Sequence, residues 1–107
     1  MRSDDLEDAL IKKLSEHFKE AAKDYVVKDS TETPFLQLTI EMTLFNYFVV
    51  RVMVEKNTVF FSIVQSGVQL PLFKSELSDS GLDAAPSVLD SEIRLRIPDK
   101  YLRAKGW

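Results

Sequence analysis

The stretch FLQLTIEMTLFNYFVVRVMVEKNTVFFSIVQSGVQLPLF, residues 35–73, decides the fold of this 107-residue chain. In its first ten residues apolar and polar side chains alternate, which is typical of a strand with one buried face. The runs that follow are rich in β-branched and aromatic residues, which favour strands. Antiparallel strands joined in a β-meander are therefore predicted at 35–43, 47–55, 58–65 and 68–73.

The turns between these strands predict how the strands align. Two-residue turns at Lys56-Asn57 and Ser66-Gly67 keep the aliphatic side chains of the last three strands on one face. Between the first two strands, the same criterion favours a three-residue turn, Leu44-Phe45-Asn46. That turn sets Ile40 opposite Val50 and places Asn46 in the left-handed conformation that Asn tolerates.

The residues before the meander repeat with the period of a helix. Apolar residues recur every four positions, and charges fill the other side. The apolar positions are Leu6, Leu10, Leu14, Phe18, Ala22 and Val26. This pattern predicts one amphipathic helix over residues 4–28.

Two further elements are predicted after the meander. The alternation in EIRLRI indicates a fifth strand over 92–97, which we expect to pair with the first strand because Pro71 suits an edge. The fragment PDKYLRAKG indicates a short helix over 98–105, with Gly106 just past its end. The predicted fold is therefore a single α+β domain, residues 1–107, with a long N-terminal helix packed on a four- to five-stranded, mainly antiparallel sheet and a short C-terminal helix.

The residues that carry most catalytic chemistry are scarce. The chain has no cysteine, which excludes disulfides and thiolate chemistry. Its one histidine, His17, has no second ligand at metal-binding spacing. The glycines at positions 67, 81 and 106 are isolated and form no phosphate-binding loop. We therefore expect no catalysis, no metal and no cofactor.

Charge and hydropathy indicate the cellular location of the protein. The N-terminus MRSDDLEDAL carries acids where a signal peptide needs basic residues, and no apolar run approaches the roughly 18 residues of a membrane helix. A cytoplasmic protein without a membrane partner is expected. The net charge of −3 disfavours non-specific binding to nucleic acid.

Residues 74–91 are predicted to form an acidic loop, because the stretch is rich in Ser and holds Gly81 and Pro86. Its acids, which we take as candidate partner-binding residues, are Glu76, Asp79, Asp83 and Asp90. Complementary charge would speed and direct encounter with a basic protein. The leading hypothesis is a small non-catalytic protein-binding module, an immunity or inhibitor protein that neutralises a basic toxin or nuclease. The competing interpretation is a solvated crossover with a little helix.

The second face of the predicted sheet is an alternative interface. The predicted register places five residues on this face: Val49, Arg51, Met53, Phe60 and Val64. One helix cannot cover both faces of a sheet, and an uncovered apolar patch marks a partner or self-association site. A dimeric secretion-type chaperone would use this face. The competing interpretation is that the C-terminal helix, with Tyr101, Leu102 and Trp107, folds back over it.

The C-terminal segment is basic and aromatic, a composition that nucleic-acid binders use. Its basic residues are Arg94, Arg96, Lys100, Arg103 and Lys105. A nucleic-acid accessory protein is therefore a further alternative. Five bases are few, and charges such as Arg94 and Arg96 are also what an edge strand normally shows.

Overall fold

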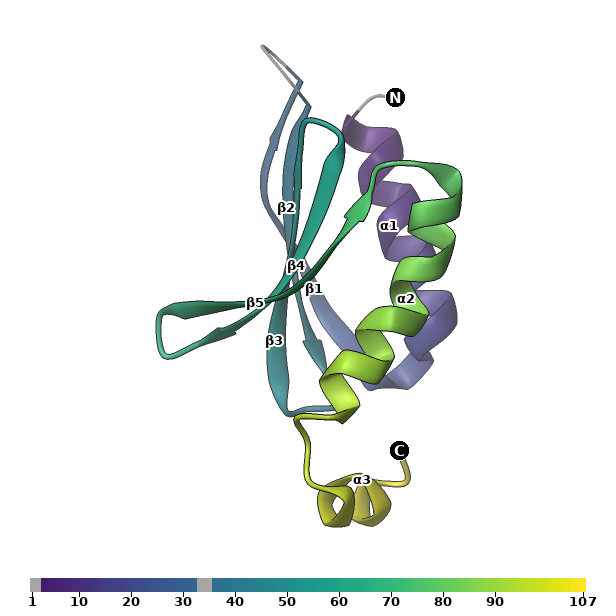
Figure 1. Ribbon diagram of the computed structural model, residues 1–107, viewed down its shortest axis with the longest axis vertical. Coiled ribbons are helices and arrows are strands. Elements are labelled where there is room, and N and C mark those ends of the chain that lie inside the picture. The colour runs from purple at the N-terminus through teal and green to yellow at the C-terminus, as the bar shows by residue number, and fades with distance from the viewer. Residues whose placement is uncertain (1–2, 33–35) are drawn as a thin grey trace.

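A computed structural model of the chain describes residues 3–32 and 36–107. It is an α+β fold in two layers, with helices α1 (Ser3–Phe18) and α2 (Asp79–Arg94) on the same side of a five-stranded sheet (Figure 1). The short helix α3 (Asp99–Lys105) lies beyond one end of the sheet. The predicted fold class is confirmed.

The sheet is an antiparallel meander in which every strand pairs with its neighbours in the chain. Its strands are β1 (Ala22–Thr31), β2 (Gln37–Leu44), β3 (Phe48–Glu55), β4 (Thr58–Gln65) and β5 (Val68–Glu76). Short turns connect each strand from β2 to β5 with the next one, so the order of the strands in the sheet follows their order in the sequence. Phe35, the first residue of one predicted strand, lies outside the described residues.

The core lies between the helices and the face of the sheet that turns toward them. The alternation read from the sequence puts Leu38, Ile40, Met42, Leu44, Val50, Val52, Val54, Val59, Phe61 and Ile63 there, all buried. The helices contribute Leu6, Leu10, Leu14 and Phe18 from α1 and Leu82, Leu89 and Ile93 from α2. Burial of these side chains is the main favourable term that holds the two layers together.

The predicted first helix, 4–28, is too long. The α-helix ends at Phe18, one 3₁₀ turn follows, and β1 begins at Ala22. Lys19 takes a left-handed φ of 52°, which ends the helix without a glycine. Ala22 and Val26 continue the four-residue spacing, yet they belong to a strand that pairs with β2.

The acidic loop predicted at 74–91 and the strand predicted at 92–97 are both wrong. β5 continues to Glu76, the Ser78 side chain accepts a hydrogen bond from the Gly81 N–H, and α2 follows to Arg94. The segment is helical because Leu82, Leu89 and Ile93 share one face and pack in the core. The fifth strand is therefore β1.

The predicted register holds in part. In β3 and β4 Val52 lies opposite Phe61, as predicted. The turn between β2 and β3 has the predicted three residues but comes one residue later, so Ile40 lies opposite Val52 and the predicted pairing with Val50 is wrong. Asn46 has the predicted left-handed φ, 52°.

The predicted C-terminal helix is confirmed to within one residue. α3 begins at Asp99, with Pro98 as the residue before it, and Gly106 ends it with a φ of 76°. A positive φ of this size costs glycine little, which explains the choice of residue.

Tyr25 of β1 offers a stability test, because its hydroxyl is buried without a hydrogen-bond partner among the described residues. Burial also raises the pKa of Tyr25 above its ordinary value. We expect Tyr25→Phe to raise the free energy of unfolding at pH 7 by about 1 kcal/mol, because an unsatisfied buried polar group is removed. Urea titrations of both proteins check this.

The same titrations above pH 10 test the raised pKa. The folded protein then keeps a proton that the unfolded chain has lost, so wild-type stability falls as pH rises past the ordinary tyrosine value of about 10. The Tyr25→Phe protein should lose less stability over this interval. An equal loss in both proteins would contradict the assignment to Tyr25.

Candidate functional site

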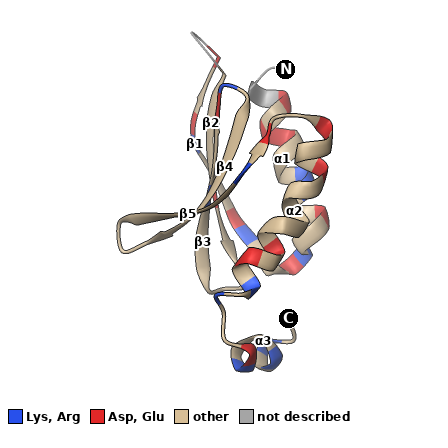
Figure 2. Ribbon diagram, viewed as in Figure 1, with Lys and Arg blue, Asp and Glu red and all other residues tan. Residues whose placement is uncertain are grey.

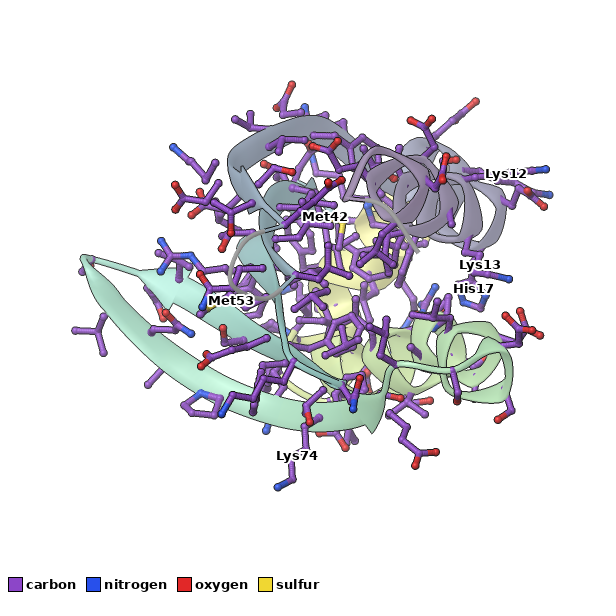
Figure 3. The ribbon with its side chains drawn as sticks, turned by 90° about the horizontal axis from the view of Figure 1, so that it is seen from above. Lys12, Lys13, His17, Met42, Met53 and Lys74 are labelled. Atoms are coloured by element: carbon purple, nitrogen blue, oxygen red, sulfur yellow. The ribbon has the colours of Figure 1, made fainter. Side chains whose placement is uncertain are left out.

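The face of the sheet turned away from the helices is the first candidate site. Three rows of side chains cross it from β3 to β5. The rows are Val49, Val64 and Gln69; Arg51, Ser62 and Pro71; and Met53, Phe60 and Lys74. Figure 3 shows Met42 of β2 among the core side chains and Met53 of β3 on the opposite side of the sheet. We call this surface the open face.

Arg51 lies at the centre of the open face and has its polar partners within the chain. Its Nε and Nη2 donate to Oε2 of Glu41 at 2.9 and 2.7 Å, and its Nη1 donates to Oε1 of Gln69 at 2.8 Å. Glu41 lies directly opposite Arg51 in the β2–β3 ladder. The guanidinium is therefore fixed, and its charge is balanced within the sheet.

Around this polar centre the open face carries exposed apolar side chains. Phe60 is 38% exposed and Val49 37%, and Val26 of β1 is also exposed. A pocket of ≈ 400 Å³ beside Phe60 is lined by Met53, Pro71 and Phe73, among others. Ser62, also part of its lining, is 2% exposed, and its Oγ has no hydrogen-bond partner among the described residues. The surface itself therefore offers apolar area to a partner, whereas the Ser62 hydroxyl is buried beneath it.

No described element covers the open face (Figure 1). The competing interpretation, in which the C-terminal helix folds back over this face, is wrong, because α3 packs at the end of the sheet against the β2–β3 turn. The Tyr101 hydroxyl donates to the Phe45 carbonyl at 2.9 Å, and the Trp107 ring lies edge-on to Phe45 with centroids 5.8 Å apart. These contacts hold the C-terminal helix away from the open face.

The two edges of the sheet are less suited to binding than the face. The pairing of β1 with β2 is interrupted by two irregularities, and β5 carries Pro71 and an irregularity of its own. Bulges and proline on edge strands hinder the addition of another strand. A partner is therefore better placed on the face than along an edge.

The predicted acidic residues do not gather in a loop. Glu76 ends β5, and Asp79, Asp83 and Asp90 lie on α2. Asp83 forms an ion pair with Lys13 of α1, and this hydrogen bond is the main cause that raises the pKa of Lys13 above its ordinary value. Two of the four acids thus have partners within the chain, since Asp90 is also paired.

Asp90 joins α1 to the end of α2. One carboxylate oxygen lies 2.9 Å from His17 Nε2, and the other accepts from Arg94 Nε at 2.6 Å. Lys13 and His17 both lie where α1 and α2 meet (Figure 3). These contacts favour a structural role for Asp90. They also give His17 a position between the two helices, whereas the sequence indicated no role for it.

Charge is nevertheless distributed unevenly between the layers. The sequences of α1 and α2 hold nine carboxylates and three cations, a net charge of −6, whereas the whole chain carries −3. Figure 2 shows acidic residues along the described parts of both helices. The acidic surface expected from a loop is therefore provided by the helical layer.

The basic C-terminal residues are divided among the end of α2, the turn that follows it and α3. Arg94 pairs with Asp90 and donates to the Trp107 carbonyl at 2.7 Å, and Arg96 pairs with Glu92 at 3.0 Å. Lys100, Arg103 and Lys105 belong to α3. The structure does not bring the five bases together into one uninterrupted basic surface.

Within residues 3–32 and 36–107, no group of three His, Cys, Asp or Glu side chains is placed to hold a metal ion. No helix in that part of the chain is long and apolar enough to cross a membrane. Comparison of the chain with protein-family models, with curated proteins and with solved structures found no match.

The sequence indicated five candidate interface residues on the open face, and none of them came from β5. Val49, Arg51, Met53, Phe60 and Val64 follow from strand alternation, and all five lie there. Gln69 and Pro71 lie within the predicted strand 68–73 but were not counted as candidate interface residues, and Lys74 lies just beyond the predicted end of that strand. Continuing the register from Ser66-Gly67 across β5 places Gln69 beside Val64, a signal that was present in the sequence.

Proposed function

We propose that the protein is a non-catalytic protein-binding module that docks its partner on the open face of its sheet. The observation that carries this proposal is that both large helices cover the same side of the sheet. The other side keeps Val49, Phe60 and Val26 partly in water. An apolar patch of this kind on a small domain is typical of an interaction site.

The centre of the open face supports docking for a second reason. Covering a charge is costly when it loses water without gaining a partner. Arg51 is bonded to Glu41 and Gln69 before any partner arrives. A partner can cover it without having to supply a counter-charge.

The second candidate is an inhibitor that binds a basic protein through the helical layer. The net charge of −6 on α1 and α2 favours it, because complementary charge speeds association and selects partners. Asp79 and Asp83, both exposed on α2, would be the first contacts of that surface.

A capture experiment from cells that make the protein separates the two candidates. The chain is immobilised as wild type, as Phe60→Lys, and as Asp79→Lys with Asp83→Lys. We expect Phe60→Lys to reduce the recovered partner at least about tenfold, because an exposed aromatic at an interface centre carries much of the binding energy. The helix double variant should retain the partner.

Leu95→Lys is the matched control, because Leu95 is 79% exposed and lies just after α2, away from the open face. It introduces the same charge at an apolar position and should leave capture unchanged. Circular dichroism and urea unfolding must show each variant folded. Loss of the partner from the helix double variant alone would refute the open-face proposal and favour the inhibitor.

A further inference from the structure

We infer that the partner on the open face is a second copy of this chain, bound face to face about a two-fold axis. This inference rests on the proposed function, since it names the occupant of the same surface. Homo-oligomers with two-fold symmetry are the commonest assemblies, and their interface must be complementary to itself. The open face has the charge and the size that such an interface requires.

Charge on the open face is balanced. Two pockets on it, lined in part by Met53 and Gln69, bring together three cations and three carboxylates: Lys28, Arg51, Lys74, Asp29, Glu41 and Glu55. The chain as a whole is at −3 and its two long helices at −6, so this surface stands apart from the rest of the molecule. A strongly basic or acidic partner gains nothing from it. A second copy brings the same balance and can oppose each sign with the other.

The polar groups at the centre suit a self-association that buries them. Arg51, Glu41 and Gln69 satisfy one another, and Gln69 Nε2 lies 3.5 Å from Met53 Sδ. Ser62 Oγ is the exception, because it is buried among these side chains without a partner within the described chain. Its burial keeps it out of reach of the second copy, so the polar complementarity of the interface comes from the charged groups.

The area is sufficient for a specific dimer. With strands about 4.8 Å apart and a rise of about 3.3 Å per residue, a face of five strands measures on the order of 600 Å². Two copies would then bury about 1,200 Å² in total, above the roughly 1,000 Å² that a specific interface needs. Twisted sheets pack in this way at about −30°.

Sedimentation of the purified protein from nanomolar to high micromolar concentration tests the inference. We expect a monomer–dimer equilibrium that Phe60→Lys weakens at least about tenfold and Leu95→Lys leaves unchanged. The chain has no cysteine, so Val49→Cys and Leu95→Cys each introduce a unique thiol. Alkylation of the thiol at position 49 should slow as the dimer forms, whereas alkylation at position 95 should not.

The outcomes distinguish failure of the inference from failure of the proposed function. A wild-type chain that stays monomeric throughout overturns the inference, and a dimer in which the thiol at position 49 reacts as fast as in the monomer overturns it as well. If such a chain still captures another protein and loses it on Phe60→Lys, the proposed function stands with a different partner. If Phe60→Lys changes neither self-association nor capture, both are refuted.

Discussion

Replacing Phe45 by alanine should lower the free energy of unfolding by about 4 kcal/mol, the range for a fully buried phenylalanine. Phe45 is 1% exposed, although it lies in the turn between β2 and β3. Its ring meets Phe18 and Trp107 edge-on, and the Arg94 guanidinium lies 4.8 Å from its centroid. One side chain thus ties the ends of α1 and α2 and the C-terminus to the sheet.

In the Phe45→Ala protein, the C-terminal segment should lose its packing before the rest of the fold unfolds. Trp107 is the only tryptophan, so its fluorescence reports whether the segment after α3 remains packed on Phe45. In Phe45→Ala we expect a red-shifted emission in the absence of denaturant, and urea unfolding gives the stability loss.

The control is Tyr47→Ala in the same turn. Tyr47 is exposed and contacts the rings of Phe48 and Tyr101, so its loss should cost only about 1 kcal/mol. A Phe45→Ala protein as stable as Tyr47→Ala, with unchanged Trp107 emission, would contradict the role assigned to Phe45.

The sequence was sufficient to predict the sheet where pattern and turn agree. Alternation identified β2, β-branched and aromatic composition identified β3 and β4, and the two-residue turn at Lys56-Asn57 set the β3–β4 register correctly. In β5 a strictly regular hairpin would pair Phe61 with Leu72. An irregularity instead brings Phe73 opposite Phe61, where the two rings stack at 4.5 Å. A bulge depends on such packing and leaves little trace in the local sequence.

The helices show why short patterns are ambiguous. Gly81, Pro86 and the serines suggested a loop, yet Leu82, Leu89 and Ile93 keep helical spacing and are buried. In EIRLRI, Ile93 and Ile97 fit a strand period of two and a helix spacing of four equally well. The segment is helical because it packs on the sheet and on α1, and these contacts between distant residues cannot be read from the local sequence.

The candidate site was predictable to the same extent. Five of its residues, with Arg51 at the centre, followed from the predicted register. Whether the open face would remain uncovered was not predictable. That depends on α3 docking at Phe45, a contact between residues more than fifty positions apart in the chain.

Replacing Gly81 by alanine should also have a large effect on the free energy of unfolding. The sign of that effect tests how closely β5 and α2 approach each other. At an ordinary helical position Gly→Ala stabilises by about 1 kcal/mol, because alanine is the better helix former. In α2 a Cβ at residue 81 would lie 2.2 Å from the Glu76 carbonyl oxygen, which belongs to the backbone at the end of β5. We therefore expect Gly81→Ala to destabilise by about 3 kcal/mol, because the strand end or the first helical turn must move.

Ser80→Ala is the matched control, one residue earlier in the same turn and exposed. It should change the free energy of unfolding by less than about 0.5 kcal/mol. Amide hydrogen exchange can locate the damage, because the bonds from Leu77 N to the Asn57 carbonyl and from Leu82 N to the Ser78 carbonyl flank the crowded point. These amides should exchange faster in Gly81→Ala, while those of β2 and β3 follow only the global loss. A stabilised Gly81→Ala protein would mean that β5 and α2 do not meet as closely as described.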